Sequence, residues 1–484
     1  MKTAECIVGI VLCCAAFSGC RTTKDVLDDY EKNLRSGSYE HASREVYELS
    51  KNGGKEELLW QLLSGSAYCM AGDCERSIGQ FDLAEDSYIA HDARSVFAVG
   101  GEGAWAMLTN DKAFEYDGGG EDRVFTCFYK AIQYAACGDA TAARAEFNRA
   151  AMHQENWIDE RKNYIAAAEE RLNSEASKKS KENGDNTDVS SSTARILTDK
   201  SFCDKINSEC KFNPFLSGDL ETLTAADYVN PYVQHATGVF RWLNGDGDAQ
   251  YYFRDVKDIV ANSTAIKDFD ESRGGHRPQE QVWIYAEDGL CAVRDEWRLD
   301  LPLILVPYAQ KYVMYAGMAL PRLKNRELGA QKWTVFAGGK LHDLEILADV
   351  DKLLKTEYDV YMRGALKREI TRTLVKIGGQ VALGILAEHA LNKKDNKQYW
   401  IYKASQASAA AWALATTGAD VRSWTSLPKC VRMTRIMRPS DGKVVVSADS
   451  ERIEIYVPSG NTMLFLRKPS PTANTSVIKV TYPD

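Results

Sequence analysis

The first half of the chain shows a helical period in its apolar positions. In residues 59–84, apolar and small side chains recur at three- and four-residue spacing on both sides of Gly72. Residues 127–150 repeat the pattern around Gly138, 66 positions further on, and Gly37 lies about one more period upstream. This separation is about two periods of a tetratricopeptide repeat, which is about 34 residues long. The pattern therefore predicts paired helices joined by tight turns, with small residues at the helix contacts.

A polar segment interrupts this pattern. Residues 173–195 contain almost no large apolar side chains, so we expect a disordered insertion that cannot repay the entropy of ordering. Helical spacing resumes over residues 228–261. The insertion is therefore expected inside a helical domain of residues 20–270 rather than at its end.

The second half of the chain changes period. Residues 282–303 alternate apolar and polar positions on either side of Glu287, Asp288 and Gly289, which predicts a hairpin. Helices are expected at residues 341–354, 360–391 and 403–416, and the longest is read as a packed amphipathic helix rather than a membrane span.

The C-terminal tail contains short apolar runs separated by Asp-Gly, Pro-Ser-Gly and Pro-rich turns, which predicts antiparallel strands. The expected fold class is thus α+β and mainly helical. Tetratricopeptide-like repeats are followed by a hairpin and helices in residues 271–430 and by a small antiparallel β domain in residues 431–484.

The N-terminus has the features of a bacterial lipoprotein signal in residues 1–19. The apolar run of residues 7–17 is too short to span a bilayer core of about 30 Å. Ser18 and Gly19 precede Cys20 as in a lipobox, which predicts a lipidated, palmitate-bearing Cys20. Arg21 follows in place of the Asp that tends to hold lipoproteins at the inner membrane, so we expect the inner leaflet of the outer membrane, facing the periplasm. An ordinary secretory signal cut near the same place is the alternative.

Charge and cysteine content narrow the partners and the chemistry. The chain has 484 residues and a formal net charge of −8, which argues against a general nucleic-acid binder. Two close pairs of cysteines could each close a small loop by a disulfide in an oxidising compartment: Cys69 with Cys74, and Cys203 with Cys210. The alternative is that these cysteines are small buried apolar residues.

Three blocks of sequence, residues 108–150, 282–303 and 419–436, carry a resemblance. With Cys20 they resemble an uncharacterised family of bacterial envelope lipoproteins that have tetratricopeptide-like N-terminal helices and are often encoded beside penicillin-binding-protein activator lipoproteins. The resemblance implies a role in cell-envelope assembly, with the peptidoglycan-synthesis machinery as partner. It carries no catalytic residues to this chain.

Exposed loops in these blocks are candidate partner contacts. Trp and Arg dominate binding hot spots, so Arg422, Trp424 and Pro428 form one candidate surface. The alternative is that Trp424 fills the junction between the last helix and the C-terminal sheet. A second candidate group is equally open between loop capping and ligand contact: Asn110, Asp111 and Tyr116.

The chain carries no recognised catalytic, metal or cofactor motif. HExxH, GxSxG, GxxxxGK and the Rossmann glycine pattern are absent, and the seven histidines are scattered singly. The acidic residues of 117–122 would repel phosphate, so a loop between helix pairs is expected there. Residues 244–248 alternate oxygen ligands as a calcium loop does, but Ala249 stands where an EF-hand needs glycine.

These observations lead to one hypothesis and two alternatives. We expect a non-catalytic periplasmic adaptor or scaffold whose concave helical surface binds another envelope protein. The first alternative is a peptidoglycan- or glycan-binding module that uses the Trp-rich second half as its platform. The second is a hydrolase with an unfamiliar site, which would need clustered carboxylates in a cleft. The partner, the oligomeric state and the binding of ions stay open at this point.

Overall fold

The computed structural model describes residues 22–97, 112, 115–182, 189–213, 222–306 and 308–482. Within these ranges the fold is α+β and mainly helical, as the sequence predicts. Cys20, Asn110 and Asp111 lie outside the described residues.

Four helix hairpins form the helical part of the body. They pair α2 (Thr23–Arg35) with α3 (Tyr39–Ser50), α4 (Glu57–Ala71) with α5 (Cys74–Phe97), α7 (Gly120–Ala136) with α8 (Ala140–Glu182), and α12 (Pro231–Leu243) with α13 (Ala249–Ile259). Shorter helices complete this part of the chain: α9 (Val189–Thr198), α10 (Lys200–Cys210), α11 (Ala225–Tyr228) and α14 (Ser263–Ser272).

The four hairpins have the same type of turn. Each turn contains a glycine with φ between 74° and 83°, at Gly37, Gly72, Gly138 and Gly245. The glycine N–H donates to the carbonyl three residues back, and the next N–H donates to the carbonyl five residues back, at all four positions. This is a Schellman motif, which needs a left-handed residue after the helix. The turns predicted at Gly37, Gly72 and Gly138 are therefore confirmed.

Close contacts lock two of the hairpins. A Cβ atom on Gly65 would lie 2.7 Å from the ring of Phe81, and one on Gly238 would lie 2.8 Å from the ring of Phe253. Because real side chains do not approach so closely, a larger residue at either glycine would push the two helices apart.

The polar segment after the third hairpin is not an open loop where it is described. Helix α8 continues to Glu182, and α9 begins at Val189. The disordered insertion predicted at 173–195 is therefore wrong over those helical residues. Glu, Lys and Ala, which are frequent in this segment, have high intrinsic helix propensities.

Two sheets and a ribbon make up the β part. The five-stranded sheet has the order β11 (Ser476–Tyr482), β10 (Asn461–Lys468), β1 (Gln281–Asp288), β7 (Cys430–Met437) and β6 (Glu345–Asp349). The four-stranded sheet has the order β5 (Lys340–Asp343), β4 (Trp333–Ala337), β8 (Lys443–Ala448) and β9 (Glu451–Tyr456). A separate ribbon pairs β2 (Val293–Asp300) with β3 (Gly317–Lys324).

Three of the predicted elements differ in this region. Gly289 has the expected positive φ, but β1 does not pair with β2: β1 pairs with β10 in parallel and with β7 in antiparallel. The helix predicted at 341–354 begins only at Val350, after β5 and β6. The tail strands do not form a domain of their own, since both sheets include strands from residues 281–349. A domain boundary at residue 430 would thus separate strands that belong to the same sheet.

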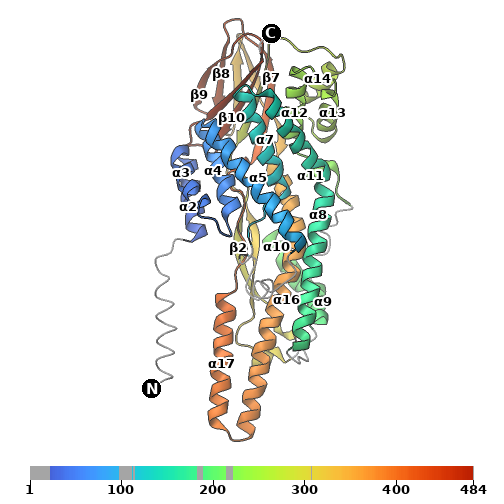
Figure 1. Ribbon diagram of the computed structural model, residues 1–484, viewed down its shortest axis with the longest axis vertical. Coiled ribbons are helices and arrows are strands. Elements are labelled where there is room, and N and C mark those ends of the chain that lie inside the picture. The colour runs from blue at the N-terminus through green and yellow to red at the C-terminus, as the bar shows by residue number, and fades with distance from the viewer. Residues whose placement is uncertain are drawn as a thin grey trace.

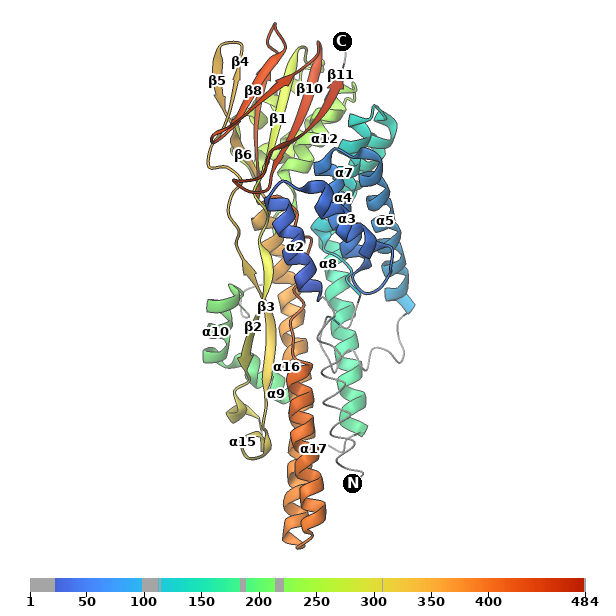
Figure 2. The ribbon, with the colours of Figure 1, turned by 90° about the vertical axis from the view of Figure 1, so that its left-hand side faces the viewer.

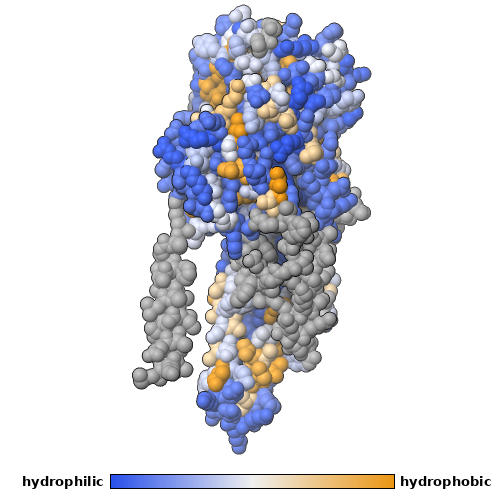
Figure 3. All heavy atoms as spheres, in the orientation of Figure 1, coloured by the Kyte–Doolittle hydropathy of each residue, from blue (hydrophilic) through white to orange (hydrophobic). Residues whose placement is uncertain are grey.

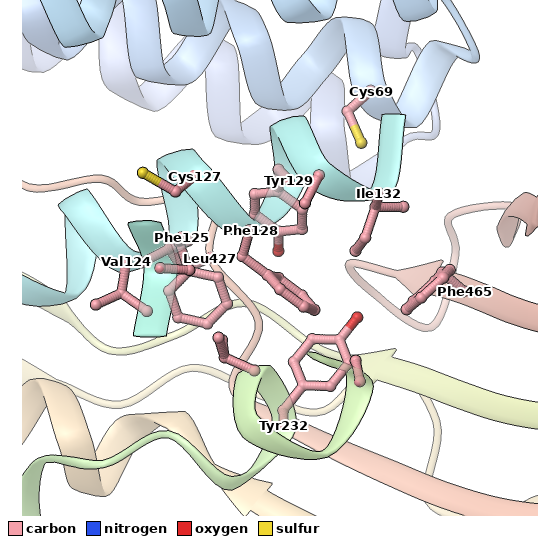
Figure 4. Close-up of a cluster of buried hydrophobic side chains, with 14 of the residues drawn as sticks. Cys69, Val124, Phe125, Cys127, Phe128, Tyr129, Ile132, Tyr232, Leu427 and Phe465 are labelled. Atoms are coloured by element: carbon pink, nitrogen blue, oxygen red, sulfur yellow. The ribbon is translucent and has the colours of Figure 1, made fainter. Parts of the chain in front are cut away.

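Alternate side chains of β1 face two different layers. Trp283 and Tyr285 join the core that the sheet shares with α4, α7 and α12, whereas Val282 and Ile284 join the core between the two sheets. Figure 2 shows the resulting order of helices, five-stranded sheet and four-stranded sheet. In Figure 4, Phe128 of α7 meets Tyr232 of α12, and Phe465 of β10 belongs to the same buried cluster.

The inner face of the helical array is therefore occupied. Helices α4, α7 and α12 are buried along almost their whole lengths against the chain's own sheet and loops. The concave helical surface that was expected to bind a partner is not free in this fold.

A helical arm projects from the end opposite to the sheets. Helix α16 (Val350–Asn392) runs from the sheet through the middle of the molecule, and α17 (Asn396–Ala415) folds back along its last turns (Figures 1 and 2). The ribbon, the short η3 (Leu303–Leu305) and α15 (Ala309–Tyr312) pack beside α16. Length and composition alone would let α16 cross a membrane, but half of its most apolar window is buried in the fold, as in a core helix.

Candidate functional site

The loop around Trp424 is a buried junction, not an exposed contact surface. The indole Nε1 of Trp424 donates to Ser66 Oγ at 2.8 Å and to Ser426 Oγ at 2.9 Å. Its ring packs against Phe81 and Tyr129, at 5.8 and 6.1 Å between centroids. Trp424 therefore fills a junction, as the alternative interpretation held, although it joins the helix hairpins to the sheet rather than the last helix to the sheet.

The other predicted contact residues are also enclosed. Arg422 pairs with Asp420 at 2.7 Å and lies 3.6 Å from Glu56, and both Arg422 and Pro428 are buried. Tyr116 is buried and donates its hydroxyl to Asp122 at 2.7 Å. The prediction that these residues contact a partner is therefore wrong for this fold, because their polar groups are satisfied inside the chain.

The cysteines pair differently from the prediction. A disulfide joins Cys74, at the start of α5, to Cys137, at the end of α7. Cys69 is a free buried thiol that accepts from Gln133 Nε2 at 2.8 Å, so it faces α7 rather than Cys74. Cys203 and Cys210 are free and lie on α10, where seven residues of helix separate them by about 10 Å, beyond disulfide reach.

A buried chain of hydrogen bonds links α12 and α14 to the sheet. The two ring nitrogens of His235 lie 3.0 Å from Asp268 Oδ2 and 2.9 Å from the Tyr285 hydroxyl. Asp268 also accepts from Trp283 Nε1 at 2.9 Å and pairs with Arg435. His235 and Asp268 are fully buried. The Tyr–His–Asp order is that of a proton relay, but here it is a hydrogen-bonded network inside the core.

A second buried network lies beside the first. Glu287 on β1 accepts hydrogen bonds from the hydroxyls of Tyr232 at 2.9 Å and Tyr129 at 3.1 Å, and Arg467 lies 3.4 Å away. Burial raises the pKa of Glu287, although Arg467 and the two tyrosines favour its charged form. This carboxylate fastens α7 and α12 to the sheet.

Among the described carboxyl groups, the one with the most strongly shifted pKa lies at the start of α7. Glu121 is 1% exposed, and burial, followed by the nearby carboxylate of Glu357, raises its pKa to about 8. Neither oxygen of Glu121 has a hydrogen bond of ordinary geometry within the described residues, although Asn230 is close enough to oppose the rise. Glu121 is therefore a neutral carboxylic acid at pH 7.

Charged and aromatic side chains from α8 and α16 enclose this acid. Glu357 on α16 accepts from Trp157 Nε1 at 3.0 Å and from Arg161 Nη1 at 2.7 Å. A Cβ atom on Gly120 would lie 2.5 Å from Trp157 Nε1, so the glycine-rich run allows α7 to begin against the indole. The expected loop at residues 117–122 thus becomes a loop followed by a buried helix start.

Glu121 and Glu357 are neighbouring carboxyl groups, which is the composition of many hydrolytic sites. A hydrolytic site would also need a cleft. The two described surface hollows, of about 430 and 400 Å³, lie against α3, α4 and the start of α5 and share no residue with the carboxylate cluster.

One group of side chains has the composition of a metal site. Ligand atoms of Glu85, Cys127 and Glu146 lie within 4.8 Å of one another. Lys130 Nζ, however, lies 2.7 Å from Glu85 and 3.0 Å from Glu146, and Arg149 contacts the same two carboxylates. These two cations hold the position that a metal ion would need.

The calcium-like loop after α12 is likewise occupied. Asp246 pairs with Arg144 at 2.5 Å, and Asp248 pairs with Arg241. Both carboxylates thus neutralise arginines from α8 and α12 rather than facing an open loop.

The tryptophans of the second half do not form an exposed platform. Trp283, Trp333 and Trp424 are at most 2% exposed. Among the described residues, Trp400 on α17 is the one exposed tryptophan, at 68%.

Trp400 belongs to an apolar surface on the arm. Six exposed large hydrophobic residues lie on α16 and α17: Ile385, Leu386, Leu391, Trp400, Ile401 and Leu414. Figure 3 shows apolar side chains gathered on the arm above its polar end. Exposed apolar patches of this kind mark interaction sites.

Comparison with known proteins gave no match: no family model, no curated protein and no solved structure is similar to the chain. The resemblance to envelope lipoproteins therefore stays a prediction.

The sequence missed both the Glu121 cluster and the arm surface. Glu121 and Glu357 are 236 positions apart, so no spacing pattern connects them. The arm could have been found, because the stretch between Lys403 and Asp420 contains no charged residue although it is long enough for four turns of helix.

Proposed function

We propose that this protein is a non-catalytic, lipid-anchored adaptor of the bacterial envelope, and that the α16–α17 arm is its docking element. The observation that carries the proposal is the exposed, nearly uncharged apolar face of the arm. Elsewhere the candidate chemical groups are buried or half-buried: Glu85, Glu146 and Glu287 are paired with other side chains, and Glu121 is enclosed by α8 and α16. The inner face of the helical array is filled by the sheet.

The body then serves as a rigid support. We propose that its four hairpins are tetratricopeptide-like repeats, which the shared glycine turn and the Gly65–Phe81 and Gly238–Phe253 contacts support. In this interpretation the inner face of the repeats packs against the chain's own sheet and not against a bound partner.

The predicted anchor fits the start of the fold. Thr22 forms a capping box with Asp25, so α2 begins at Thr23, three residues after Cys20. Three residues span at most about 11 Å, so a lipid on Cys20 would keep α2 close to the membrane surface. Labelling with a palmitate analogue tests this point: we expect Cys20→Ser to abolish the label, and unchanged labelling would remove the anchor from the proposal.

Site-directed photocrosslinking in living cells tests the docking role. We place p-benzoylphenylalanine at Leu386 on the arm and, as a matched control, at Tyr251 on α13, which is 53% exposed. A discrete adduct with an envelope protein from position 386, without one from position 251, is expected. Equal labelling from both positions, or adducts that disappear after digestion with a muramidase, would contradict an adaptor and favour the glycan-binding alternative.

A further inference from the structure

The outer face of α17 has the spacing of a helix–helix interface. Trp400, Ala404, Ala407, Ala411 and Leu414 recur at alternating intervals of four and three residues, and all five are exposed. An adjacent face, with Gln406, Ala410 and Ala413, is buried. Alternating three- and four-residue intervals are those of the seam of a coiled coil.

This face is complementary to itself in the antiparallel direction. If two copies of α17 cross at Ala407, Trp400 of one copy lies opposite Leu414 of the other, and Ala404 lies within one residue of the level of Ala411. The small residues then meet at the centre, where helices can approach to about 8 Å, and the large residues close the two ends.

Charge favours the same direction. The tip of the arm carries Lys393, Lys394 and Lys397 beside a single acid, Asp395, although the chain as a whole is acidic. At the base of the arm, Glu296 accepts from the backbone N–H of Ala419 at 2.9 Å and is paired with Arg298 at 2.8 Å. The exposed Asp300 lies there as well, because it pairs with Gly317, whose carbonyl accepts from Thr417 Oγ1. An antiparallel pair brings each basic tip to the partner's Asp300.

We propose that a second copy of this chain docks on α17, so that two arms form an antiparallel four-helix bundle with the two bodies at opposite ends. The inference rests on the proposed function only in treating the arm as an interaction element. It leaves Ile385 and Leu386 on α16 for a different envelope protein.

Cysteine crosslinking of the full chain in its native membrane tests the pairing. The described free cysteines are all buried, so an introduced thiol on α17 is the accessible one. Under mild oxidation with copper phenanthroline, we expect Ala407→Cys to give a disulfide-linked dimer, because residue 407 lies near the two-fold axis. Ala415→Cys is the matched control on the same face: two such residues would lie about 20 Å apart and should stay unlinked.

The register has its own test. Cells that express Trp400→Cys together with Leu414→Cys should yield the mixed dimer, while each variant alone should not. A symmetric dimer at position 415, an adduct of position 407 with another protein, or no adduct at any position would overturn the proposal.

A charge variant tests the association without chemistry. Ala407→Glu should shift the purified chain from dimer to monomer in sedimentation equilibrium and leave the melting temperature of the body unchanged; a persisting dimer would refute the α17 interface. The two proposals can fail separately. If the chain dimerises through α17 but position 386 gives no crosslinked adduct, the adaptor function is rejected and the dimer stands. If position 386 gives its adduct but the chain does not dimerise, the dimer is rejected and the adaptor function stands.

Discussion

Replacing Glu121 by glutamine is expected to flatten the dependence of stability on pH. In the folded chain the pKa of Glu121 is about 8, against 4.5 for a free glutamate side chain. Between these values the folded chain keeps a proton that the unfolded chain releases. The folded state binds more protons, so the free energy of unfolding falls as the pH rises.

The size of the effect follows from the shift. One such proton changes the free energy of unfolding by about 1.4 kcal/mol per pH unit, or about 3 kcal/mol between pH 5 and pH 7.5. Glutamine cannot release a proton, so Glu121→Gln should lose this slope. Any cost of burying the amide is a constant offset and leaves the slope untouched. The groups that face position 121, Asp122, Glu357 and Asn230, are the same in both proteins.

Urea-induced unfolding, followed by tryptophan fluorescence from pH 5 to pH 8, measures this slope. Glu75→Gln, at an exposed position in the first turn of α5, is the matched control and should follow the wild type. If the curves of wild type and Glu121→Gln stay parallel, Glu121 is not a neutral buried acid and the interpretation of the α7 start is wrong.

Three further predictions concern packing and the disulfide. Gly120→Ala should lower the free energy of unfolding by about 1–3 kcal/mol, because its Cβ meets Trp157 Nε1, whereas Gly79→Ala, with open space around it in α5, should be neutral or stabilising in the same urea titration. Trp424→Ala should cost about 3–5 kcal/mol by loss of a buried indole and its two hydrogen bonds; a smaller cost than that of an exposed Trp400→Ala would contradict its role at the junction. Cys74→Ser should cost about 4 kcal/mol for a bond that closes 63 residues, and alkylation of the unfolded, unreduced wild type should modify Cys69 but neither Cys74 nor Cys137.

Local signals in the sequence predicted the helix hairpins well. Gly72 and Gly138 sit at turns whose hydrogen bonds close within six residues, so the pattern that specifies them is contained in a short window. The strand runs after Cys430 were also recognisable, because alternation of apolar residues is local. The pairing of the strands could not be predicted in this way. β1 lies beside β10, about 180 positions away, and the two-residue alternation within a strand does not indicate which strand is its neighbour.

The candidate sites show the same limit. Burial of Trp424 is one of the two interpretations that the sequence allows, yet its partner Ser66 lies 358 positions away. The acidic neighbours of Glu121 in the sequence predict a polar loop. Burial by α8 and α16, which no local pattern encodes, turns Glu121 into a neutral acid.

Helix α16 gives the arm a mechanical property. The helix starts at Val350 directly after β6 ends at Asp349, and the backbone N–H of Val350 donates to the carbonyl of Lys429, just before β7. Its 43 residues form a rod of about 64 Å with no loop between sheet and tip. A load on the tip is therefore carried along one continuous helix, first to the ribbon and to the helices that pack beside α16 and then to the edge of the five-stranded sheet.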